Sequence, residues 1–278
     1  MRSPAFSEKS DGDSKIMTGD PRQADADAAQ ALMDQVERDG AVQLPALSTA
    51  ELCVLGAMQA TLIDEVSWSW WSGMTEAERF GISAMALKFL VHRELLDEPE
   101  PGAIEDDSTE NVALPARPLL AMILAGRTQP AFVVVRAEGA KAAPERMRLY
   151  GIAEEGRGLR AVLAETGPGK LPTRFGPAYE YALVSPAEAV NSLLRWVDRA
   201  PAGHKLGRRR PKIIDVYQPN KGAGPARDRF EVHRGGPSGL RVEQGSTDSS
   251  GTSAPIDCDE DGFGRLLTDL FTRQGNAA

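Results

Sequence analysis

The hydrophobic period of the chain changes near Ala131, and this change constrains the fold more than any single motif. Before that point, apolar side chains recur at the three- and four-residue intervals of amphipathic helices; after it, they alternate or run together as in strands. Short segments that contain glycine separate the middle strand-like runs, and such short turns join antiparallel neighbours. We therefore expect an α+β fold in which an antiparallel β-sheet is flanked by helices and preceded by a helical N-terminal region.

The strand-like runs form two groups, and each group ends in a helix. The first group leads into a helix over 186–199, where Ser185 and Glu188 have the spacing of a capping box. The second group, within 212–245, leads into a helix that begins near Asp259. This order predicts two pseudo-twofold strands–helix halves, although the two halves share negligible residue identity.

Four segments follow from these patterns. Residues 1–23 are polar and poor in apolar side chains, which predicts a disordered tail. Residues 24–113 form a helical region with an acidic linker, 114–199 form the first strands–helix half, and 200–278 form the second. Within the helical region, Ser48-Thr49-Ala50-Glu51 and Thr75-Glu76-Ala77-Glu78 both have capping-box spacing. We expect helices over 24–39, 48–65, 76–96 and 115–126.

The charge of the chain is unevenly distributed. The 278 residues contain 32 Lys+Arg and 40 Asp+Glu, a net charge of −8 that argues against non-specific nucleic-acid binding. Residues 48–113 hold 3 basic and 13 acidic side chains, whereas residues 114–240 hold 21 and 11. In the first interpretation, the two regions face each other or are both solvated. In the second, a basic sheet surface binds an acidic protein partner.

The sequence contains none of the common catalytic motifs. Walker, GxGxxG, GxSxG and HExxH patterns are missing, and the two cysteines are too few for a disulfide scaffold or a Cys-rich zinc site. Cys53 is expected to be a buried apolar side chain, and a catalytic pair of Cys258 with His233 is a remote alternative. The acidic residues around Asp259 are better explained by helix capping than by calcium binding. We expect no enzyme activity, no catalytic residues, no cofactor and no metal.

Two clusters are candidate partner-binding features. The first comprises Trp68, Trp70 and Trp71, which fall between two capped helices and serve either as core under a helical hairpin or as a binding hot spot. The second comprises Arg208, Arg209 and Arg210, which lie in a Gly- and Pro-rich linker and are either solvated or in contact with an acidic protein or nucleic acid.

The order of elements resembles the EspG family, cytoplasmic chaperones of actinobacterial type VII (ESX) secretion. The segments that carry the resemblance span 48–274 as a pattern without an invariant motif: TEAERFGISAMALKFLVHRELL (75–96), PARPLLAMILAGRTQPAFVVVRA (115–137), YALVSPAEAVNSLLRWV (181–197) and FGRLLTDLF (263–271). The resemblance implies an antiparallel sheet flanked by helices, pseudo-twofold halves and binding of a helical PE–PPE-type substrate. The polar N-terminal tail, the tryptophan cluster and the Ser/Thr-rich stretch 245–255 depart from the family pattern.

A DNA-binding regulator is the alternative function. In that interpretation helices 49–65 and 76–96 belong to a winged-helix unit and 131–154 form the wing. Glu76 and Glu78 argue against it, because a recognition helix normally presents cations and amides at its start. We expect a protein client that is helical and acidic, with nucleic acid unlikely. The lack of an apolar stretch near ~18 residues and of an apolar leader predicts a cytoplasmic protein without a membrane span.

Overall fold

The structure is a computed structural model, and its described residues form an α+β fold. They are 21–56, 65–98, 116–129, 132–137, 146–154, 158–167, 174–198, 212–218, 226–234, 239–245 and 255–275. The helices are α1 (Pro21–Asp39), α2 (Thr49–Gly56), α3 (Glu65–Ser72), α4 (Glu76–His92), α5 (Pro118–Arg127), α6 (Pro186–Asp198) and α7 (Glu260–Gly275). The strands are β1 (Ala41–Ser48), β2 (Phe132–Ala137), β3 (Arg146–Glu154), β4 (Gly158–Gly167), β5 (Ala178–Val184), β6 (Lys212–Gln218), β7 (Ala226–Arg234), β8 (Leu240–Gly245) and β9 (Ile256–Cys258).

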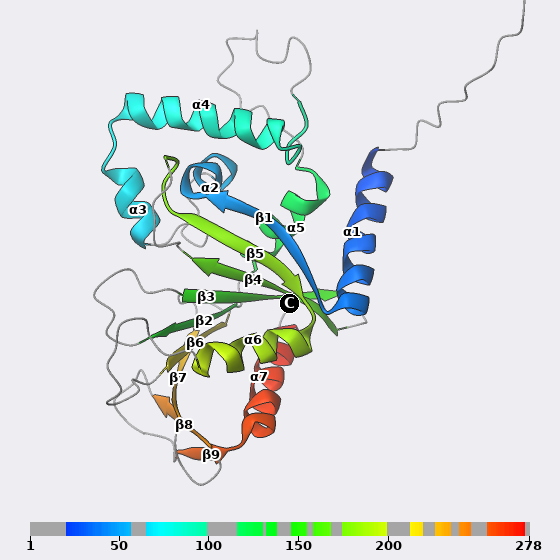
Figure 1. Ribbon diagram of the computed structural model, residues 1–278, viewed down its shortest axis with the longest axis vertical. Coiled ribbons are helices and arrows are strands. Elements are labelled where there is room, and N and C mark those ends of the chain that lie inside the picture. The colour runs from blue at the N-terminus through cyan, green and yellow to red at the C-terminus, as the bar shows by residue number, and fades with distance from the viewer. Residues whose placement is uncertain are drawn as a thin grey trace, which may run out of the picture.

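All nine strands join one antiparallel sheet in the order β1-β5-β4-β3-β2-β6-β7-β8-β9 (Figure 1). At its centre, β2 pairs with β6, and from this pair β3–β5 extend to one side and β7–β9 to the other. In the chain, each of these two groups of strands is followed by a helix, β5 by α6 and β9 by α7. A twofold axis normal to the sheet between β2 and β6 exchanges two antiparallel strands while keeping the same face up. The topology therefore confirms the pseudo-twofold strands–helix halves.

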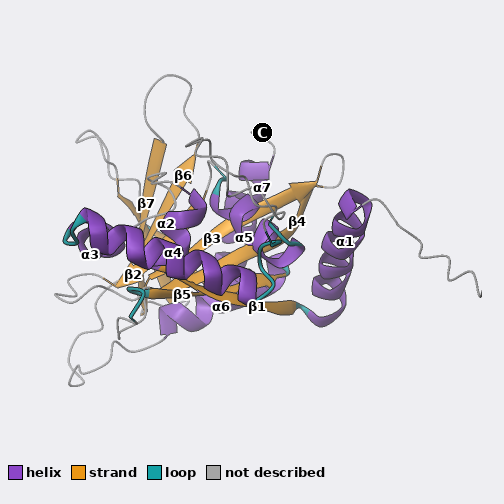
Figure 2. Cartoon of the chain, turned by 90° about the horizontal axis from the view of Figure 1, so that it is seen from above, coloured by secondary structure: helices purple, strands orange, loops and turns teal. Residues whose placement is uncertain are grey.

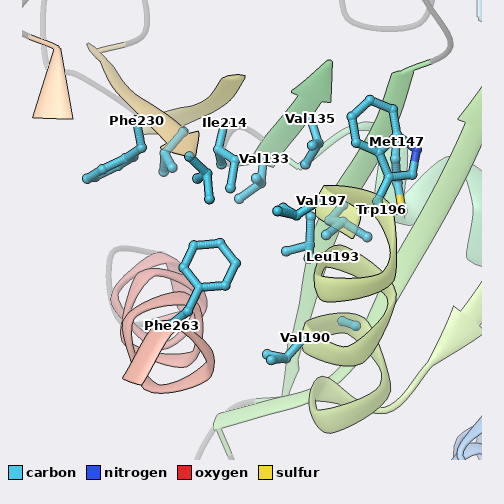
Figure 3. Packing of buried hydrophobic residues seen from close by; sticks show 14 of the residues in the cluster. Val133, Val135, Met147, Val190, Leu193, Trp196, Val197, Ile214, Phe230 and Phe263 are labelled. Carbon is cyan, nitrogen blue, oxygen red and sulfur yellow. The ribbon is translucent and has the colours of Figure 1, made fainter. Parts of the chain in front are cut away.

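One face of the sheet packs against α6 and α7, which lie side by side. Figure 3 shows Phe263 of α7 and Leu193 of α6 pointing toward Val133 and Ile214 of the two central strands. Both halves of the sheet contribute to this cluster, because α6 follows β5 and α7 follows β9 and each returns across the same face. The prediction that 131–184 form an antiparallel sheet packed by the helix after Ser185 is confirmed.

The opposite face is covered by helices from the N-terminal region and by α5. Its hydrophobic cluster joins Val36 of α1, Leu90 of α4 and Ile123 of α5 to side chains of β3, β4 and β5. The helices α1, α2 and α5 contact β1 as well. The first half of the sheet is therefore packed on both faces, and α4 lies outermost, beyond α2 and far from α6 and α7 (Figure 1).

The expected N-terminal region needs several corrections. Residues 41–48 form strand β1 rather than a link between helices, and α1 begins at Pro21 instead of residue 24. Pro45 interrupts the alternation of β1, and its pairing to β5 shifts register between Leu44 and Leu47, so the strand depends on a partner about 140 residues away. The short strand β9 was also not predicted.

The helix expected over 48–65 is described only to Gly56 as α2. The capping boxes at Ser48 and Thr75 are confirmed, since Glu51 accepts from the Ser48 N–H and Glu78 accepts from the Thr75 N–H. Ser185 caps α6 by accepting from the Glu188 N–H. The tail 1–20, the segment 57–64 and most of the acidic linker, 99–115, lie outside the described residues.

The contact between α5 and β4 gives a test of the packing. A Cβ on Gly126 would lie 2.4 Å from Leu163 Cδ2, whereas a Cβ on Gly81 of α4 would meet nothing within 4 Å. We expect Gly126→Ala to lower the free energy of unfolding by about 1–3 kcal/mol through overpacking. Gly81→Ala, a control in an exposed helix, should raise it by up to about 1 kcal/mol. Urea unfolding of both variants is the measurement, and equal midpoints would contradict this packing.

Candidate partner-binding site

The three clustered tryptophans lie on helix α3, a separate short helix between the capped helices α2 and α4. In a helix, residues two apart point to nearly opposite sides, so Trp68 and Trp70 diverge. Trp68 is 49% exposed and Trp71 only 6%, while Trp70 is half-buried. Each of the two sequence interpretations therefore holds for one residue. Trp71 is buried, as the core interpretation requires, and Trp68 is exposed to solvent, as the hot-spot interpretation requires.

Trp70 packs over the turn that leads into β5. A Cβ on Gly176 would lie 2.7 Å from Trp70 Cε3, and Gly176 has a φ of +86°, which side chains other than glycine rarely adopt. The same turn is held to α2, because the Ala50 N–H donates to the Phe175 carbonyl over 3.1 Å. Gly176 therefore lets α3 approach the sheet closely, and the sequence contained no signal for this long-range contact.

A chain of buried hydroxyls joins α3 to the sheet. Ser67 Oγ of α3 is hydrogen-bonded to the Tyr179 hydroxyl of β5. Thr49 Oγ1 of α2 lies 2.9 Å from Ser67 Oγ and 3.0 Å from the Pro177 carbonyl oxygen. Thr49, Ser67 and Tyr179 are all buried. Because each hydroxyl both donates and accepts, the three can be satisfied in one direction along the chain.

Helix α4 presents further large apolar side chains. Phe80 is 78% exposed, and Phe89 is 44% exposed although its ring meets Phe175 edge-on at 5.2 Å between centroids. In Figure 2, α3 and α4 follow one another along the side that faces the viewer. We call Trp68, Phe80 and Phe89 the α3–α4 aromatics. They account for three of the five large hydrophobic side chains that are exposed among the described residues.

The start of α4 adds negative charge beside these aromatics. Glu76 and Glu78 are exposed in its first turn. Hydrogen bonds from the Thr75 backbone N–H and then from its hydroxyl hold the pKa of Glu78 below its usual value. Glu78 therefore remains charged at neutral pH, and this end of the helix is acidic.

A buried ion cluster lies under α5. Arg127 Nη1 of α5 is 2.8 Å from Glu165 Oε2 of β4, and Arg148 Nη1 of β3 is 3.4 Å from the other oxygen, Oε1. Arg127 also donates to the Tyr181 hydroxyl. Burial, the largest effect, lowers the pKa of Arg127, but Glu165, Tyr181 and Tyr150 together raise it by more, so the net pKa is raised. Burial, followed by the charge of Glu165, raises the pKa of Tyr181.

Other arginines of the basic region also have acidic partners within the molecule. Arg160 Nε donates to Glu37 of α1 over 3.0 Å, and Arg117 Nε donates to Asp97 over 2.9 Å. Arg229 Nε donates to Asp215 over 2.8 Å. Of these three pairs, only Arg117–Asp97 joins the basic region 114–240 to the acidic region 48–113, because Glu37 precedes the acidic region and Asp215 lies within the basic one. Arg208, Arg209 and Arg210 lie outside the described residues.

The remote alternative of a Cys258–His233 pair is not assembled. Cys258 packs beside the cluster of α6 and α7, whereas His233 pairs in register with Arg241, and Arg241 with Asp257. Because side chains alternate along strands, Cys258 and His233 lie on opposite faces of the sheet. Within the described residues, no group of three or more His, Cys, Asp or Glu side chains is placed to hold a metal ion.

The strands that a winged-helix unit would use as a wing are β2 and β3. β2 is the middle strand of the sheet and is bonded to β3 on one side and to β6 on the other. A free two-stranded wing is therefore not present among the described strands. None of the described helices combines the length and the apolar character that a membrane crossing requires.

No protein-family model matches the sequence, and no curated protein is similar to it in sequence. The resemblance to EspG therefore stays a prediction from the order of elements.

The exposures on α3 predict opposite outcomes for two tryptophans. We expect Trp71→Ala to lower the free energy of unfolding by about 3–5 kcal/mol, because it removes a buried aromatic ring. Trp68→Ala should change it by no more than about 0.5 kcal/mol, since half of the ring is already in water. Urea unfolding followed by circular dichroism measures both, and a large loss from Trp68→Ala would assign that residue to the core.

The cysteines give a test by chemical reactivity. Burial raises the pKa of the Cys53 thiol to about 12, so only about one thiol in ten thousand is a thiolate at pH 8. Burial and then Asp259 and Asp257 raise the pKa of Cys258, which is less buried. We expect a Cys258→Ser variant to resist maleimide at pH 8 when folded and to react in urea. Rapid labelling of the folded variant, read by intact mass, would show that Cys53 is accessible.

Proposed function

We propose that the protein is a non-enzymatic binding protein that holds a helical client, in the manner of the EspG-type chaperones it resembles. The observation that carries the proposal is the exposure of Trp68, Phe80 and Phe89 on neighbouring helices. Large apolar side chains left in water are candidates for partner contact, and tryptophan is enriched at binding hot spots. Phe80 and Phe89 are nine residues apart on α4 and so project from opposite sides of that helix, which makes Trp68 and Phe80 the pair to test.

The client is proposed to be helical because helices offer ridges that pack into the grooves of other helices. The first half of α4 leaves a helix surface open to such packing, since no residue from Glu76 to Met85 is buried. The resemblance implies a PE–PPE pair as the client class and the cytoplasm as the location.

The client is further proposed to be acidic, with its acidic side chains away from the segment that meets Glu76 and Glu78 of α4 and with Arg208, Arg209 and Arg210 steering its approach. Residues 114–240 carry ten more basic than acidic side chains. Several described arginines of this region are paired with acids. Charges that steer an encounter act on its rate and salt dependence more than on stability.

The test is binding of a PE–PPE pair, chosen from the genes nearest to that of this chain and co-purified as a complex. We expect Trp68→Ala with Phe80→Ala to weaken binding by about 2 kcal/mol or more while the unfolding midpoint stays unchanged. Replacing Arg208, Arg209 and Arg210 by serine should slow association and flatten its salt dependence. Association and dissociation rates by biolayer interferometry at low and high salt provide both measurements.

Two controls test whether binding is specific to the aromatic side chains and to a protein client. Leu119→Ala removes a large apolar side chain of similar exposure, 37%, from helix α5 and should leave binding unchanged. A DNA duplex at moderate salt tests the regulator alternative. Equal losses from the Leu119 and Trp68 variants, or tighter binding to the duplex than to any PE–PPE pair, would contradict the proposed function.

A further inference from the structure

Helix α3 is attached to the molecule in an unusual way, because its side chains take no part in the main packing. No described residue of α3 belongs to either of the two hydrophobic clusters that sandwich the sheet. A helix of only eight residues is unstable by itself in water and needs tertiary contacts to persist. The position of α3 therefore depends on its few direct attachments to neighbouring elements.

Two of those attachments meet β5 and the turn before it. The first is the hydroxyl chain of Thr49, Ser67 and Tyr179, and the second is the packing of Trp70 over Gly176. The indole N–H of Trp71 is buried and finds no acceptor within the described parts of the chain. The cost of burying this N–H offsets part of the gain from burying the Trp71 ring, whereas the hydroxyl chain is a satisfied polar contact between α3 and the sheet.

Tyr179 is suited to this role by its own fixed position. Its ring belongs to the buried cluster beneath α5, and the Arg127 guanidinium carbon lies 5.5 Å from the ring centroid. Because strand pairing and ion cluster hold the ring, its hydroxyl is a fixed point against which Ser67 is placed. Ser67 precedes Trp68 directly, so the same contact determines how Trp68 faces the solvent.

We propose that Tyr179 and Ser67 are positioning residues for partner binding: their hydroxyl contact fixes α3 so that Trp68 is presented to the client. The inference rests on the proposed function for its binding readout, whereas the position of α3 can be tested without any client. Neither hydroxyl touches the client, since both are buried.

The experiment uses Tyr179→Phe, which removes one oxygen and keeps the ring. The matched control is Tyr181→Phe, which removes a buried hydroxyl from the same face of the same strand but from the Arg127 side of the cluster. In Tyr179→Phe, amides of residues 65–74 should exchange about three- to tenfold faster, the effect of one lost hydrogen bond on a local equilibrium. Acrylamide should also quench the α3 tryptophans more strongly. In Tyr181→Phe, the exchange rates of residues 65–74 and the acrylamide quenching should both stay at the wild-type level.

A second pair of variants asks whether the hydroxyl itself matters. Thr49→Ser keeps the hydroxyl and should match the wild type, whereas Thr49→Val should reproduce faster exchange in 65–74. Affinity for the PE–PPE pair should fall about three- to tenfold in Tyr179→Phe and Thr49→Val alone.

The outcomes separate the two proposals. Unchanged exchange in Tyr179→Phe, or equal acceleration in Tyr181→Phe, overturns the positioning role whatever the client does. Faster exchange without loss of affinity also overturns it, while Trp68→Ala then still decides the proposed function. If the wild type binds no PE–PPE pair, the proposed function fails and, with it, the binding part of the inference.

Discussion

The buried carboxylate of Glu165 is the constraint on which the arrangement of the first half depends. A charge taken out of water is costly unless it is paired, and two arginines from different elements approach its two oxygens. Arg127 comes from α5 and Arg148 from β3, so a helix and two strands must keep their relative positions to satisfy one side chain. The surrounding cluster excludes water, which makes loss of one partner far more costly than it would be on the surface.

The twofold arrangement explains how a sheet of this width is packed. Two meanders start from the central pair β2–β6, and their closing helices return over one face. The edges are of a kind that discourages further strand pairing. At one edge β1 contains Pro45 and a register shift, and at the other β9 is three residues long. The sheet can therefore be large without offering a long regular edge to another chain.

The proposed function uses the side of the molecule to which the twofold symmetry does not extend. The helices α3 and α4 belong to the N-terminal region, for which the second half has no counterpart among the described elements. They carry Trp68, Phe80 and Phe89 outward, while Trp71 and the hydroxyl of Ser67 turn inward. Within the short helix α3, Ser67 and Trp71 face inward and hold its position, while Trp68 faces the solvent, where the proposed client would bind.

The sequence by itself determined the fold class, the antiparallel pairing of successive strands from β2 through β5, the two strands–helix halves and the caps at Ser48 and Thr75. These follow from local signals: period-two alternation, short turns, and hydroxyls placed three residues before a glutamate. Tertiary structure alone decided that 41–48 is a strand, because β1 exists through hydrogen bonds to β5 about 140 residues away. Tertiary structure also decided which tryptophan is exposed, since Trp68, Trp70 and Trp71 are the same residue type and differ only in what packs against each. Gly176, Ser67 and Tyr179 make that choice, and their contacts join residues more than a hundred positions apart that no local pattern connects.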